Sequence, residues 1–161
     1  MRVTIIALAL GSMLGLSTSL SMAKERIYIL AGQSNMMGRG KTSELNPSYK
    51  STPANVTFYY QGRPRKLAHY AFFGPEVTFA HEVARAFPHD QHILIKSAAT
   101  GSSIKQWQPD QPLYRSLIRQ LGLALPNDTN RVDAIIWMQG EQDAKKIADA
   151  QLYQVRFNQF I

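Results

Sequence analysis

The sequence predicts an α/β domain with a parallel sheet between two layers of helices, a three-layer α/β/α fold. Three apolar runs, at residues 27–31, 92–97 and 134–138, are rich in β-branched and aromatic residues and have the composition of strands buried on both faces. Segments with apolar residues at helical spacing separate these runs. Parallel strands need long crossover connections, so this alternation places helices on the faces of the sheet.

The first predicted strand, residues 27–31, ends in a polar, glycine-rich turn that contains Ser34. Gly32 permits a sharp departure from the strand, and a helix starting in the turn would present its positively polarised N-terminus to the hydroxyl. A nucleophile belongs at this point, because ligands of open α/β sheets bind outside the carboxyl ends of the strands. The alternative is that Ser34, with Asn35, only caps the helix.

Between this turn and Pro88 the sequence predicts a loop, a strand and a helix. Residues 41–53 are polar and contain prolines, as expected of a loop, and the β-branched and aromatic segment 56–60 predicts a strand. The helix begins at Pro75, because proline suits the first helical position and Glu76 complements the positive helix end. It ends before Pro88 and is expected to cover one face of the sheet.

The second buried strand, residues 92–97, also ends in a turn of small polar residues. This turn, residues 98–103, contains Gly101. Leucines at every fourth position from Leu113 to Leu125 then predict another helix. The pattern repeats the strand, polar turn and helix of the first unit.

The third buried strand, residues 134–138, runs directly into the polar block 139–143 and then a final helix. This helix carries an apolar stripe up to the last residues of the sequence. We expect the stripe to be uncovered in the 161-residue chain, which predicts a C-terminally truncated domain whose last elements are missing. The stripe consists of Ala150, Tyr153, Phe157 and Phe160.

The three polar turns are expected to meet at one edge of the sheet, where their residues supply the groups that acyl transfer requires. Ser34 provides a nucleophile and, through its backbone N–H, one donor to the oxyanion. Gly101 provides a second backbone donor, because a residue without a side chain lets the main chain approach closely. Gln139 offers a side-chain amide. We therefore predict Ser34 as the catalytic residue and Ser34, Gly101 and Gln139 as the oxyanion hole.

Five further polar residues are expected to support this site. Gln33 and Asn35 flank the serine, and Lys96 ends a buried strand, where it needs a partner such as Glu141. Glu141 and Asp143 fit three roles: a glycosidase acid and base, metal ligands, or a helix cap. Because only two acids are clustered and no histidine is near, the metal role is disfavoured, and no metal is predicted.

Length and composition are those of one globular domain, with 161 residues of which 45% are hydrophobic. Residues 1–23 differ, because Arg2, the apolar stretch 5–16 and small residues up to Ala23 are typical of a secretory signal peptide. The apolar stretch is shorter than the roughly 20 residues that span a bilayer. We expect cleavage after Ala23, a secreted or periplasmic protein without membrane attachment, and one domain over residues 24–161.

The charge distribution gives no indication of a nucleic-acid partner. The formal net charge is +7, and the basic residues are dispersed apart from the cluster 63–66, which predicts a solvated turn. No nucleic-acid-binding motif accompanies this cluster, so no nucleic-acid partner is predicted. No cofactor is predicted. The sequence contains no cysteine, so a secreted form must be stabilised by its core.

Four segments carry a resemblance to a known family: GQSNMMGRG, GPEVTFA, KSAATGSSIKQW and WMQGEQDA, in this order. Together they resemble the SGNH-type carbohydrate esterases of the sialate O-acetylesterase and carbohydrate esterase family 6 group, over residues 26–153. The resemblance implies a flavodoxin-like three-layer fold and a serine esterase that removes acetyl groups from carbohydrates, an acetylated sugar or sialic acid. It makes Ser34 the nucleophile and Gly101 the oxyanion glycine. The wider superfamily has an asparagine in the last block, and we assign its role to Gln139.

The general base of this family is the histidine of a C-terminal Asp-x-x-His motif, which this sequence lacks. No histidine follows His92, and no aspartate is followed three residues later by a histidine. Two functions therefore remain. The chain is either an esterase whose C-terminal part lies outside this sequence, inactive as given, or a secreted carbohydrate-binding protein that retained a degenerate esterase site. We favour the first.

Overall fold

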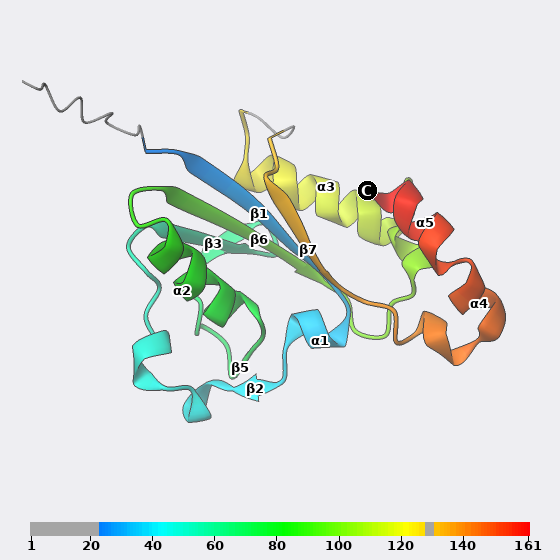
Figure 1. Ribbon diagram of the computed structural model, residues 1–161, viewed down its shortest axis with the longest axis horizontal. Helices are drawn as coiled ribbons and strands as arrows, with labels where there is room; N and C mark the ends of the chain where they lie inside the picture. The colour runs from blue at the N-terminus through cyan, green and yellow to red at the C-terminus, as the bar shows by residue number, and fades with distance from the viewer. Residues whose placement is uncertain (1–22, 128–130) are drawn as a thin grey trace, which may run out of the picture.

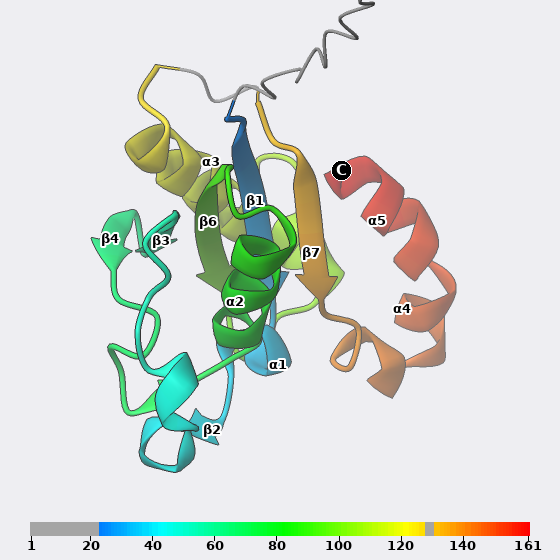
Figure 2. The same ribbon diagram turned by 60° about the vertical axis from the view of Figure 1, so that its left-hand side comes forward.

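The computed structural model describes residues 23–127 and 131–161, so nearly all of the expected signal peptide lies outside the described residues. Its centre is a five-stranded sheet in the order β4-β3-β6-β1-β7 (Figures 1 and 2). Four strands run parallel, and the edge strand β4 is antiparallel to β3. The strands are β1 (Glu25–Gly32), β3 (Val56–Tyr60), β4 (Arg63–Arg65), β6 (Gln91–Ala98) and β7 (Ala134–Met138), with β2 (Gly40–Lys41) and β5 (Phe72–Phe73) as a separate ribbon.

Helices cover both faces of the sheet, which confirms the predicted three-layer fold (Figures 1 and 2). One face packs against α1 and α2, and the other packs against α3 and α5. None of the helices in the described part of the chain has the length and apolar character that crossing a bilayer requires. The helices are α1 (Ser34–Met37), α2 (Glu76–Ala86), α3 (Pro112–Ala124), α4 (Ile147–Gln151) and α5 (Tyr153–Phe160), with short 3-10 helices at Thr42–Glu44, Pro47–Tyr49, Ile104–Trp107 and Asp143–Lys145.

Strand β1 shows why the sheet needs both helical layers. Its side chains alternate between faces, so that Ile27 and Ile29 enter the core beneath α3 whereas Tyr28 and Leu30 enter the core beneath α2. All four are less than 9% exposed. A strand buried on both faces is therefore apolar at consecutive positions, as the sequence pattern predicted.

The register of the strands brings their carboxyl ends level. Gly32, the last residue of β1, pairs with Ala98 on β6 and with Met138 on β7. Because each of these residues ends its strand, the three polar turns begin at the same edge of the sheet. The convergence expected from the sequence is thus a consequence of strand register.

Two sequence predictions are wrong, one about the burial of a strand and one about the secondary structure of an exposed segment. Strand β7 was expected to be buried, yet Ile135 and Met138 are 41% and 40% exposed, because β7 is the outer strand of the sheet beside β1. The basic segment 63–66 was expected to form a turn, yet Arg63–Arg65 form the edge strand β4. Both errors concern strands with one neighbour in the described sheet.

The apolar stripe of the final helix is covered in part, contrary to expectation: Phe160 is buried and Tyr153 and Phe157 are half-buried, whereas Ala150 is exposed. The helix breaks at Leu152 into α4 and α5, and α5 packs on the core. Phe160 is 6% exposed, and its ring lies 4.7 Å from the ring of Trp137 and 6.1 Å from that of Trp107. An uncovered stripe therefore no longer supports the expectation of a truncated domain.

Candidate active site

Gly32 joins β1 to the serine turn at a point of close backbone contact. A Cβ atom built on Gly32 would lie 2.1 Å from the carbonyl oxygen of Met138, and the φ angle of Gly32 is +151°. The next residue, Gln33, donates its backbone N–H to the same carbonyl at 2.9 Å. Only glycine lets the chain leave β1 while remaining hydrogen-bonded to the end of β7.

Ser34 is the first residue of α1, so its amide has no hydrogen-bond partner within the helix. The N-cap residue is Gln33, and no side chain caps this helix. The capping role considered for Ser34 and Asn35 is therefore not what the structure shows. Asn35 is exposed and instead donates its side-chain amide to the carboxylate of Glu141, which links the serine turn to the turn after β7.

The Gly101 turn is held against the end of β1. Ala99 donates its backbone N–H to the Gly32 carbonyl at 3.0 Å, and the buried Ser102 accepts a hydrogen bond from the indole of Trp107 at 3.0 Å. Gly101 has a φ angle of +72°, and nothing lies within 4 Å of a Cβ atom built on it. The glycine is thus required by backbone conformation, and the turn faces open space.

Gln139 connects all three turns through its side-chain amide. The amide nitrogen donates to the Ser102 carbonyl at 2.8 Å and to Asp143 Oδ2 at 2.7 Å, and it lies 3.4 Å from the side-chain oxygen of Gln33. Both amide protons therefore have strong acceptors within the protein. Donation by Gln139 to an oxyanion requires one of these bonds to be released, and this role stays a prediction.

Asp143 is 1% exposed and acts as a tie between turns. Its Oδ2 accepts from Gln139 and from the backbone N–H of Ile104 at 2.9 Å. The carboxylate thereby fixes the start of the 3-10 helix that follows the Gly101 turn. Asp143 and Glu141 do different things, because Glu141 is exposed and bound to Asn35, and the described residues contain no cluster of three metal-ligating side chains.

Tyr153, which was not predicted as a site residue, supports the backbone of the third turn. Its hydroxyl donates to the Gln139 carbonyl at 2.8 Å and accepts from the indole of Trp137 at 2.8 Å. Burial raises the pKa of Tyr153 above its ordinary value, so the phenol remains a donor at neutral pH. The only signal in the sequence was its place in the apolar stripe.

Lys96 pairs with Glu76 and not with Glu141, which corrects the sequence prediction. Its ammonium lies 2.6 Å from Glu76 Oε2 and donates to the Met37 carbonyl at 2.8 Å, and both charged side chains are 4% exposed. Lys96 lies opposite Leu30 on β1 and therefore faces α2, which Glu76 begins. Burial lowers the pKa of Lys96 from its ordinary value of 10.5, although the neighbouring carboxylate raises it.

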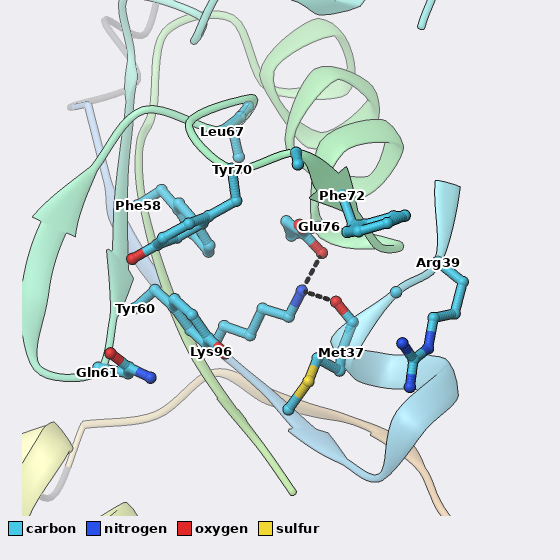
Figure 3. Close-up of a pocket in the computed structure, with 12 residues that line it drawn as sticks. Met37, Arg39, Phe58, Tyr60, Gln61, Leu67, Tyr70, Phe72, Glu76 and Lys96 are labelled. Carbon is cyan, nitrogen blue, oxygen red and sulfur yellow. Dashed lines mark hydrogen bonds and ion pairs between the residues drawn. The ribbon is translucent and has the colours of Figure 1, made fainter. Parts of the chain in front are cut away.

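The Lys96–Glu76 pair lies in the wall of a pocket of about 400 Å³ beside α1 (Figure 3). Met37 and Gly38, at the end of α1, contribute one side of this pocket. Aromatic residues from β3 and from the segment before α2 contribute most of the rest, namely Phe58, Tyr60, Tyr70 and Phe72.

None of the four histidines is hydrogen-bonded to Ser34 in the described part of the chain. His92 lies at the amino end of β6, opposite the serine turn, and its Nε2 contacts the Phe87 carbonyl at 3.1 Å. His81 contacts the Ser51 carbonyl at 3.0 Å. Ser34 therefore lacks a visible general base among these residues.

Comparisons with known proteins agree with this architecture. The family model "Carbohydrate esterase, sialic acid-specific acetylesterase" matches residues 24–161. A probable carbohydrate esterase of Arabidopsis thaliana is 26% identical, and the alignment covers 80% of this chain. It covers 58% of that relative, so the chain spans less than two thirds of its length.

Solved structures share the fold at low sequence identity. A protein from Arabidopsis thaliana has a TM-score of 0.71 and 22% identity, with 86% of this chain and 66% of that chain covered. NanS has a TM-score of 0.66 and 16% identity, covering 88% and 61%. A carbohydrate acetylesterase of Xanthomonas citri has a TM-score of 0.60 and 18% identity, covering 84% and 36%.

Proposed function

We propose a function from one premise: the chain belongs to the carbohydrate esterase, sialic acid-specific acetylesterase family, whose model matches residues 24–161. In this proposal the chain is the nucleophile-bearing part of a serine esterase that removes O-acetyl groups from carbohydrates. The observation that carries it is the position of Ser34. Its amide begins α1 at the edge where β1, β6 and β7 end, beside the open Gly101 turn.

The proposed reaction begins with attack of the Ser34 hydroxyl oxygen on the acetyl carbonyl carbon. The backbone N–H groups of Ser34 and Gly101 donate to the developing oxyanion, because both belong to turns whose conformation is fixed before substrate binds. Collapse of the intermediate breaks the bond to the sugar oxygen, which takes the proton that the general base removed from Ser34; the sugar leaves as its hydroxyl and the acetyl group stays on Ser34. Water then hydrolyses the acetyl-serine ester and releases acetate.

The proton of Ser34 needs a base, and we place this base outside the 161 residues. The sequence has no histidine after His92, and the histidines that are hydrogen-bonded in the structure contact backbone carbonyls far from the serine turn. The family resemblance implies an Asp-x-x-His segment in this role. The relative of which the chain covers 58% is longer, which is consistent with a further segment.

Within residues 23–127 and 131–161 no histidine is hydrogen-bonded to Ser34, and this also favours a second candidate, a non-catalytic carbohydrate-binding protein with a degenerate site. For either function we propose export, with cleavage after Ala23, because the family match begins at residue 24. Amino-terminal sequencing of exported protein that returned Met1 would overturn the cleavage site.

Acetate release from acetylated sugars distinguishes the two candidates. We would compare the given chain, a version extended with the family's Asp-x-x-His segment, and the extended version with Ser34→Ala. The given chain should show only trace turnover, since about 10³ to 10⁴-fold catalysis over water survives loss of a triad member. The extended version should gain several orders of magnitude, because base and nucleophile act together. An extended version that stays at the trace level, with sugar binding intact, would favour the binding protein.

A further inference from the structure

The pocket beside α1 has no assigned occupant, and its walls combine aromatic rings with one buried ion pair (Figure 3). We propose that it binds the sugar ring of the substrate and that it selects an uncharged pyranose over a sugar acid. This inference rests on the proposed esterase function and names the substrate class of the same site.

The pocket adjoins the end of α1, the helix that begins with the proposed nucleophile Ser34. Met37 and Gly38 line it, and Met37 is three residues after Ser34 on the same helix. Three residues of an α-helix span about 4.5 Å along its axis. A ring held in the pocket can therefore carry an ester group that extends toward the Ser34 hydroxyl and the Gly101 turn.

The aromatic walls suit the apolar face of a sugar ring. The rings of Tyr60 and Tyr70 meet edge to face with centroids 5.6 Å apart, and Phe72 lies across the pocket from them (Figure 3). Tyr70 and Phe72 are 42% and 52% exposed, so their rings are available to a ligand. Pockets for small molecules generally combine such apolar walls with a few placed polar groups.

Lys96 and Glu76 provide those polar groups. The lysine ammonium has three donors, of which Glu76 Oε2 and the Met37 carbonyl use two. Glu76 accepts from Lys96 and from the Gly74 N–H but retains free lone pairs. A donor and an acceptor side by side match two adjacent sugar hydroxyls, because each hydroxyl both donates and accepts.

The same pair disfavours a carboxylate in the pocket. The positive charge of Lys96 is compensated by Glu76 at 2.6 Å, so the buried pair carries no excess positive charge. A ligand carboxylate beside Lys96 would also approach the Glu76 carboxylate in a site where charges are weakly screened. Arg39 is the other lining cation, and it is exposed at the edge of the pocket, where attraction to an anion is weak.

The test measures binding without catalysis. Saturation-transfer NMR titrations of the chain would compare methyl glycosides of glucose, galactose, mannose and xylose with methyl glucuronide, methyl galacturonide and N-acetylneuraminic acid. We expect at least one neutral glycoside to bind more tightly than every acid. The proposal would be overturned if one of the acids bound more tightly than all four neutral glycosides, or if no neutral glycoside bound.

Substitution of exposed aromatic residues locates the binding site without disturbing the core. Tyr70→Ala and Phe72→Ala should each weaken neutral glycoside binding by roughly 2 to 10-fold, the usual range for loss of one aromatic contact. The matched control is Phe87→Ala, because Phe87 is 41% exposed and lies at the other end of α2, outside the pocket. Equal effects of all three substitutions, or no effect of the first two, would contradict a sugar site in the pocket.

The outcome is separable from that of the esterase proposal, because the titrations can be repeated on Ser34→Ala. Glycoside binding in the pocket without acetate release by the extended protein would contradict the esterase proposal and would leave the assignment of the pocket unaffected. The opposite result would contradict the pocket assignment alone. In that case the extended protein releases acetate, and Tyr70→Ala and Phe72→Ala are as active and bind glycosides as tightly as the unsubstituted protein.

Discussion

Replacing Glu76 with glutamine should destabilise the protein strongly, because it leaves Lys96 as a buried cation without its partner. Glutamine has nearly the same volume and keeps an oxygen that can accept the Gly74 N–H, now bound by Glu76 Oε1 at 3.0 Å. The substitution therefore removes the charge, and it also removes the acceptor of Lys96, because the amide nitrogen that replaces Oε2 is a donor facing the ammonium. Lys96 would retain the Met37 carbonyl as its acceptor at 2.8 Å.

The expected cost is about 3 to 5 kcal/mol at neutral pH, the usual result of removing one partner from a buried ion pair. Both partners are 4% exposed, so solvent screening does not reduce this figure. The cost should shrink as pH rises toward 10.5, because the substitution removes the carboxylate that raises the pKa of Lys96 and leaves the burial that lowers it, so the pKa is lower in the folded variant than in the unsubstituted protein. Over that range the unfolded chain binds more protons than the folded protein, and folding stability therefore increases with pH.

Urea unfolding followed by circular dichroism at pH 6, 7.5 and 9 measures this cost. The control is Glu82→Gln, which removes an exposed carboxylate paired with Arg85 and should cost less than about 1 kcal/mol. The double variant Glu76→Gln with Lys96→Met should recover much of the loss, since it removes the unpaired charge. A Glu76→Gln variant no less stable than the Glu82→Gln control would refute the reasoning.

Three further predictions concern the turns and the acid limit of stability. Gly32→Ala should destabilise the protein more than Gly101→Ala in urea unfolding, because a Cβ at Gly32 meets the β7 backbone at 2.1 Å whereas a Cβ at Gly101 meets nothing within 4 Å. Asp143→Ala should lower the free energy of unfolding by about 1 to 3 kcal/mol in the same assay, since it removes the acceptor of two buried N–H groups, those of Ile104 and Gln139. The N–H of Ile27 lowers the pKa of Asp133 below 3.8, so its contribution to stability is present above that pH and lost as pH falls below it. Asp133→Asn should therefore flatten the acid side of the stability profile, and an unchanged profile would argue against this role.

The sequence predicted the strands well because burial on both faces leaves a continuous apolar signal. Strands β3 (Val56–Tyr60) and β7 (Ala134–Met138) have the predicted bounds. The other two parallel strands, β1 and β6, are longer than predicted by one or two residues at each end. Burial was harder to predict, because the number of neighbours of a strand depends on its place in the sheet. The exposure of Ile135 follows from such a place.

The partners of site residues could be predicted less well than the turns that carry them. The turns meet because Gly32, Ala98 and Met138 lie in register, which follows from the parallel sheet. The pairing of Lys96 with Glu76 depends on which face of β6 the lysine occupies, whereas the sequence prediction considered only Glu141, at the end of another strand.

The pocket was not predicted, because no motif marks its aromatic walls. Tyr60 ends β3, whereas Tyr70 and Phe72 belong to a segment that the sequence pattern leaves without a strong helix or strand signal. These residues become neighbours only through the packing of that segment over the end of the sheet. A site made by such packing needs the structure before it can be seen.

The central claim, that Ser34 is the nucleophile, is tested most directly by covalent labelling of the extended protein with a fluorophosphonate, followed by peptide mass mapping. A fluorophosphonate reacts with an activated serine, so we expect one adduct, on the peptide that contains Ser34, and loss of both adduct and acetate release in Ser34→Ala. An adduct on Ser102 or Ser103, or acetate release that survives Ser34→Ala, would contradict the account.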